Sequence, residues 1–89
     1  MQPTIVLVLA ESPEAARKWI AAQPRDPRRP VTYAYANRWS AFLGRSQGRG
    51  RTYFARVGEW WRHDANEEAY WWARDNGFEE WKHDGAGGR

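Results

Sequence analysis

The chain has 89 residues, the size of one small domain, and seven of them are tryptophan. It contains no cysteine, which excludes a disulfide framework, a thiolate nucleophile and a cysteine-based metal site. The net charge is only +3, with the basic excess in the middle of the chain and an acidic segment after Glu59. We predict a single domain over residues 1–84, followed by a flexible tail over 85–89.

The stretch from Thr4 to Ala10 is the only long apolar run in the sequence. Its five consecutive aliphatic residues leave no polar face, which predicts a strand at the centre of a sheet with helices on both sides. The run is too short to span a bilayer and has no signal-peptide flank. We therefore expect a cytoplasmic protein with no membrane partner.

A helix is predicted directly after this strand, because Ser12 can cap it and Pro13 suits its first turn. It should extend over residues 13–23 and end there, because the basic connector that follows contains three prolines. Its helical periodicity directs three side chains toward the sheet. These are Ala16, Trp19 and Ile20.

Alternating residues predict two further strands, over 31–36 and 52–57. Between them, residues 38–44 are expected to form a short helix that directs Trp39, Phe42 and Leu43 inward. A last helix is expected from a capping Asp64, with Glu67 at capping-box spacing, to Asn76, where Gly77 and Phe78 form the C-terminal cap.

This order of elements predicts an α/β fold, a single small domain with a three-stranded sheet and the first strand in the middle. Parallel pairing is favoured, since a strand, a helix and a second strand form a right-handed crossover unit. The alternative is an α+β fold, in which the second and third strands pair as an antiparallel hairpin.

Catalytic and metal-binding motifs are poorly matched. The segment 44–52 has some features of a phosphate-binding loop, but its glycine spacing is wrong, Arg51 replaces the lysine, and a strand follows instead of a helix. A metal site needs imidazole and carboxylate ligands that are held rigidly by their neighbours. Here Asp64 is already expected to cap a helix, and the pair His83-Asp84 lies beside the glycine-rich tail. We therefore predict no enzyme activity, no cofactor and no metal.

The ends of the strands offer the remaining polar candidates for a small-molecule site. As exposed strand-end residues they need no function. They are Glu11, Asn37, Arg38 and Glu59.

The surplus of tryptophan is more informative, because so small a core cannot bury every indole, and Trp and Arg are enriched at protein-binding hot spots. Helical phase places Trp71 opposite the inward face of the last helix. We predict a protein-binding surface formed by Trp60, Trp61, Trp71 and Arg74. Two other covers for Trp71 are open: Arg74 stacking on its ring, and a homodimer.

Nucleic acid is the alternative partner. The segment 44–51 combines glycines with Arg45, Arg49 and Arg51, whose guanidinium groups can neutralise phosphates while nearby aromatic rings stack on bases. The acidic C-terminal third and the modest net charge argue against this partner.

A short aliphatic strand, the helix sequence Glu14-Ala15-Ala16-Arg17-Lys18-Trp19, and Arg56-Val57-Gly58 ahead of an aromatic pair occur in this order. In these features the chain resembles small uncharacterised α/β proteins encoded by bacteriophages of actinobacteria. The resemblance covers most of the chain and is one of pattern and composition. It implies a non-enzymatic accessory protein that binds a host or phage macromolecule in the cytoplasm of a bacterial host, and it transfers no catalytic residue.

Overall fold

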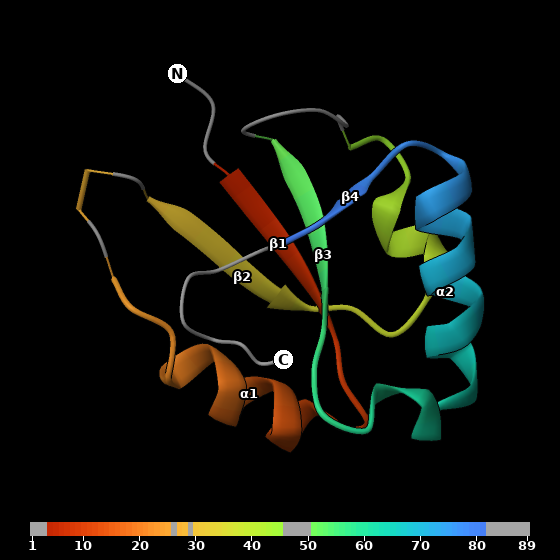
Figure 1. Ribbon diagram of the computed structural model, residues 1–89, viewed down its shortest axis with the longest axis horizontal. Helices are drawn as coiled ribbons and strands as arrows, with labels where there is room; N and C mark the ends of the chain where they lie inside the picture. The colour runs from red at the N-terminus through yellow and green to blue at the C-terminus, as the bar shows by residue number, and fades with distance from the viewer. Residues whose placement is uncertain (1–3, 26, 29, 46–50, 82–89) are drawn as a thin grey trace.

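A four-stranded parallel sheet forms the centre of the protein, with strand order β2-β1-β3-β4. The computed structural model describes residues 4–25, 27–28, 30–45 and 51–81 (Figure 1). The predicted loop residues 46–50, the pair His83-Asp84 and the predicted tail lie outside this range. The elements are β1 Thr4–Leu9, α1 Pro13–Ala21, β2 Val31–Tyr35, η1 Trp39–Phe42, β3 Thr52–Arg56, η2 Trp60–Arg62, α2 Asp64–Asp75 and β4 Glu79–Glu80.

The predicted α/β class, the parallel pairing and the position of the first strand between the second and third are confirmed. The alternative fold, with an antiparallel hairpin of β2 and β3, is wrong. Both strands pair with β1 and lie on opposite sides of it. A strand with only apolar side chains is most stable at such a position, because both of its faces and both of its edges are then covered.

Each face of β1 belongs to a different apolar core. Val6 and Val8 pack in a cluster with Ala16 of α1, whereas Leu7 and Leu9 pack in a cluster with Ala69 of α2. The helices α1 and α2 therefore cover opposite faces of the sheet, and η1 lies beside α2 (Figure 1). The alternation of strand side chains thus divides one apolar run between two layers.

Helix α1 begins as predicted, with the Ser12 hydroxyl accepting a hydrogen bond from the Ala15 amide at 3.1 Å. Ala16 is fully buried, and Trp19 and Ile20 pack against the same cluster, so the predicted inward face is confirmed. The helix ends at Ala21, two residues before the predicted Gln23. Pro24 disfavours helical backbone at the residue before it, which explains the earlier end.

The predicted cap of the last helix is wrong by one residue. His63 is the N-cap of α2, and its Nδ1 accepts a hydrogen bond from the Ala65 amide at 3.3 Å. Asp64 is the first helical residue, where its carboxylate faces the positive end of the helix dipole. A histidine cap was missed because the usual cap residues are Ser, Thr, Asp and Asn.

The C-terminal cap of α2 is confirmed. Gly77 adopts a φ of 87°, and the Phe78 amide donates to the Ala73 carbonyl at 2.9 Å. This arrangement buries the Phe78 side chain and directs the chain along β3. Beyond the cap, Glu79–Glu80 form strand β4, and the Trp81 amide donates to the Phe54 carbonyl at 2.7 Å. Two glutamates carry no alternating pattern, so the fourth strand was missed.

The short helix expected over residues 38–44 is the 3₁₀ helix η1, and its inward face was predicted only in part. Phe42 is buried, but Leu43 is 57% exposed and Trp39 is 36% exposed. With three residues per turn, Trp39 and Phe42 lie on one side while Leu43 points away from it. Trp39 packs on Trp72 of α2 with ring centroids 5.5 Å apart.

Asn66 joins α2 to the carboxyl end of β1. It is fully buried, and its Nδ2 donates to the Ala10 carbonyl at 2.7 Å and to the Trp60 carbonyl at 2.9 Å. A single amide thus fixes the start of α2 to both β1 and η2. Buried hydrogen bonds of this kind fix the relative position of elements because an unpaired group would be unfavourable.

We predict that Asn66→Ala lowers the free energy of unfolding by about 2–4 kcal/mol, because the buried Ala10 carbonyl and the partly buried Trp60 carbonyl lose their donor and a small cavity forms. Chemical denaturation of the purified variant measures this loss. Glu68→Ala, an exposed change on the same helix, is the control and should stay within about 0.5 kcal/mol. Equal effects of the two substitutions would contradict the role of Asn66.

Candidate functional site

Four aromatic side chains from η2 and α2 form one continuous row. The centroids of Trp61 and Trp60 are 6.4 Å apart, those of Trp60 and Tyr70 are 5.3 Å apart, and those of Tyr70 and Trp71 are 5.1 Å apart. These spacings are those of contacting aromatic pairs. We refer to Trp61, Trp60, Tyr70 and Trp71 as the aromatic row.

The middle of the aromatic row is anchored in the core, and its ends face solvent. Tyr70 is buried and Trp60 is half-buried, and both pack in the cluster beneath α2. In contrast, Trp61 is 56% exposed and Trp71 is 53% exposed. The exposed indoles are therefore held by rings that the fold itself immobilises.

Two guanidinium groups lie over the aromatic row. Arg56 lies 4.5 Å from the Tyr70 centroid and 5.5 Å from that of Trp60. Arg74 lies 5.7 Å from the Tyr70 centroid and 5.8 Å from that of Trp71, and its Nη1 donates to the Tyr70 hydroxyl at 3.0 Å. These are cation–π distances, so the rings of the aromatic row accept guanidinium groups on their faces.

Arg56 is also paired with β4. Its Nε and Nη2 each donate to one carboxylate oxygen of Glu80, both at 2.8 Å. The hydrogen bonds to Glu80 raise the pKa of Arg56, and burial opposes them. The bidentate pair holds Arg56 in its stacked position on Tyr70.

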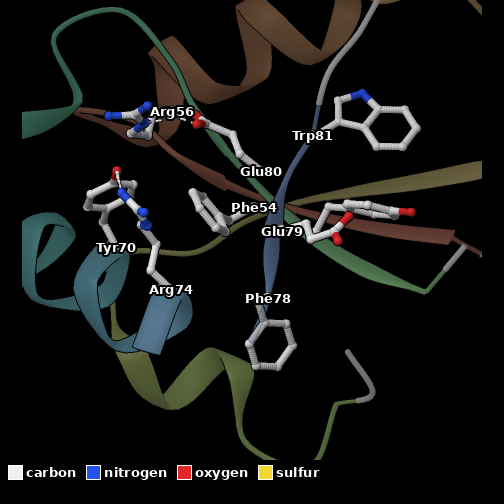
Figure 2. A pocket seen from close by; sticks show the side chains of 9 residues that line it. Phe54, Arg56, Tyr70, Arg74, Phe78, Glu79, Glu80 and Trp81 are labelled. Carbon is white, nitrogen blue, oxygen red and sulfur yellow. Dashed lines mark hydrogen bonds and ion pairs between the residues drawn. The ribbon is translucent and has the colours of Figure 1, made fainter. Parts of the chain in front are cut away.

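A pocket of about 640 Å³ opens beside this pair, around strand β4 (Figure 2). Figure 2 shows Arg56 and Glu80 joined on one side of it, Arg74 against Tyr70, and Trp81 on the other side of β4. The pocket combines aromatic walls with two cations and two carboxylates. Its lining is Tyr53, Phe54, Arg56, Tyr70, Arg74, Phe78, Glu79, Glu80 and Trp81.

The predicted residues Trp60, Trp61, Trp71 and Arg74 are brought together in this region. Stacking of Arg74 on Trp71, one of the two alternative covers left open by the sequence, is observed, yet it leaves more than half of the indole exposed. Sequence reasoning missed Tyr70, which is buried in the core cluster and contacts both Trp60 and Trp71.

Sequence reasoning also missed Arg56. Its position on β3 gave no signal of the contact with α2, which only the tertiary structure creates.

The other tryptophans of the predicted surplus have partners elsewhere. Trp72 packs against the α2 cluster, 6.2 Å from Phe42 by ring centroids. Trp81 packs on Tyr53 at 5.1 Å and belongs to the cluster beneath α1. These two indoles are structural and do not extend the aromatic row.

The basic segment is described only at its two ends. Arg45 is exposed, and its Nε donates to the Ala41 carbonyl at 2.9 Å. Arg51 is exposed, and its carbonyl accepts from the Ile5 amide at 2.8 Å. Arg49 lies outside the described residues. Arg51 directly precedes β3, whereas Trp60 and Trp61 follow β3, so Arg51 and these two tryptophans lie toward opposite ends of that strand.

Two of the strand-end candidates, Asn37 and Glu59, contact side chains outside that set. Asn37 Nδ2 lies 3.3 Å from His63 Nε2, and Glu59 pairs with Arg62. His63 Nδ1 accepts a backbone hydrogen bond, so in the neutral ring the proton lies on Nε2, which then acts as a donor. The Asn37 amide satisfies this donor when it is turned so that its oxygen, and not its nitrogen, faces Nε2. Within the described ranges, no three potential ligands come together as a metal-binding group.

Comparison of the chain with protein-family models, curated proteins and solved structures finds no match. Over the described part of the chain, neither helix has the length and apolar character needed to cross a bilayer.

We predict that Arg56→Lys lowers the free energy of unfolding by about 1 kcal/mol, because lysine provides neither the bidentate pair with Glu80 nor a planar group to stack on Tyr70. Thermal and chemical denaturation measure the change. Arg62→Lys is the matched control, since Arg62 pairs with Glu59 on an open surface and its replacement should shift stability by less than about 0.5 kcal/mol. A loss at Arg62 equal to that at Arg56 would contradict the prediction.

Proposed function

We propose that the protein is a small non-enzymatic, phage-type accessory protein that binds a host or phage protein in the cytoplasm of a bacterial host. The observation that carries this proposal is the aromatic row, with two indoles more than half exposed at its ends. The core-packed rings Trp60 and Tyr70 hold these indoles in place.

The energetics of the exposed indoles support a protein partner. Burying the open half of one indole would contribute on the order of 1–2 kcal/mol from the hydrophobic effect. Because Trp61 and Trp71 are attached to immobilised neighbours, less side-chain entropy is lost when they bind. Rigid tryptophan and arginine side chains at one surface are the composition of a binding hot spot.

We predict that Trp61→Ala and Trp71→Ala each weaken capture of a defined protein partner from bacterial lysate by about tenfold or more, while stability changes by less than about 1 kcal/mol. Affinity capture followed by mass spectrometry measures the first effect and denaturation the second. Trp39→Ala is the control, because Trp39 is a partly exposed tryptophan outside the aromatic row. Unchanged capture by both variants in the aromatic row would refute the proposal.

A homodimer would cover the same rings. Sedimentation velocity of the wild type and of Trp71→Ala separates this case from a different partner. A concentration-dependent dimer that dissociates in the variant would assign the aromatic row to self-association.

Nucleic acid binding is the second candidate. It is favoured by Arg45 and Arg51, which are exposed and form no ion pair among the described residues. Guanidinium groups without carboxylate partners are free to contact phosphates, and such binding weakens steeply with salt.

For this candidate we predict that replacing Arg45, Arg49 and Arg51 together by Ala leaves the fold intact and removes any salt-sensitive binding of single-stranded nucleic acid. Circular dichroism and a filter-binding titration measure the two properties. Binding that survives the triple substitution would exclude this segment as the interface.

A further inference from the structure

The outer face of α2 carries a strong local charge around Trp71. Glu67 and Glu68 precede Trp71 by one helical turn and Asp75 follows it by one turn. These three carboxylates and Asp64 are exposed, and none of them forms an ion pair within the described residues. Arg74 is the single cation of this helix, and its guanidinium lies over both Tyr70 and Trp71. The exposed indole of Trp71 therefore lies on a helix face that carries four carboxylates and one guanidinium group.

The rings beside this face already bind guanidinium groups. Arg56 and Arg74 stack on Trp60, Tyr70 and Trp71 within the protein. No guanidinium lies over Trp61 among the described contacts, and Trp71 keeps more than half of its surface open. The aromatic row can therefore accept further cations in the same geometry, with carboxylates alongside to pair with them.

From this combination we infer that the segment bound at Trp71 is cationic, a lysine- or arginine-rich stretch of a partner protein. Its basic side chains stack on Trp71 and Trp61 and pair with Glu67, Glu68 and Asp75. The inference rests on the proposed protein-binding function and adds the chemistry of the partner. It also separates this surface from the nucleic-acid candidate, because phosphates would be repelled by the same carboxylates.

Two fluorescent peptides of equal length test the inference, one alternating Arg with Tyr and Ala, the other with Glu in place of every Arg. Fluorescence anisotropy at low and high salt gives their affinities for the intact protein. We expect the Arg peptide to bind at least about tenfold more tightly than the Glu peptide at low salt, and to weaken as salt rises.

A pair of charge-matched variants locates the binding. The double substitution E67Q/E68Q should weaken the Arg peptide about fivefold, whereas E11Q/E14Q, which removes the same charge near α1, should change it less than about twofold. W71A should weaken the peptide as well. Equal effects of the two double variants would overturn the inference, as would tighter binding of the Glu peptide or no binding of either peptide.

The outcome is separable from that of the proposed function. If W71A abolishes capture of a protein partner while E67Q/E68Q leaves that capture unchanged, the aromatic row binds protein but the partner is not cationic. If E67Q/E68Q instead dissociates a homodimer in sedimentation, the occupant is a second copy of the chain, and the inference as stated is wrong.

Discussion

Burial of β1 on both faces is the constraint on which the rest of the structure depends. Val6 and Val8 must be covered on one side and Leu7 and Leu9 on the other, and each of these side chains is almost fully removed from water. Two separate apolar layers follow, one completed by α1 and the other by α2 with η1. In a chain of this size neither layer has aliphatic side chains to spare, so aromatic rings fill both of them.

The candidate site is a continuation of one of these layers. Tyr70 packs against Phe54 inside the α2 cluster, with centroids 5.5 Å apart, and its other ring–ring contacts are with Trp60 and Trp71 of the aromatic row. The same ring therefore serves packing and presents Trp71. Arg56 connects this region to the sheet edge through Glu80, so β4 contributes to the site although it is only two residues long. The buried Tyr70 ring therefore contacts both the stacked Arg56 guanidinium and the exposed Trp71 indole.

Local patterns were sufficient for much of the fold. The apolar run of β1, the alternation of β2 and β3, and the Gly77 cap all depend on neighbours in sequence, and these features were predicted correctly. The features that the sequence did not predict depend on tertiary contacts or, for the His63 cap, on an unusual residue type. Strand β4 forms because Phe78 is buried and leads the chain along β3, and Arg56 reaches Tyr70 only across the folded sheet. The exposure of Trp71 was predictable from helical phase. Its acidic neighbours are also visible in the sequence, but they indicate a cationic partner only once the structure shows guanidinium groups stacked on the adjacent rings.

The parallel sheet also has a consequence for biosynthesis. β1 is the interior strand, yet it is synthesised before β3, its partner on one side, which begins only at Thr52. At about 5–20 residues per second, the ribosome leaves the apolar side chains of β1 without that cover for a few seconds. During this interval β1 can pair only with β2, and its remaining edge could add a strand from another chain. Association between chains at high expression should therefore begin at the stage of the nascent chain, where a holdase chaperone that binds Ile5 to Leu9 would cover the open edge of β1.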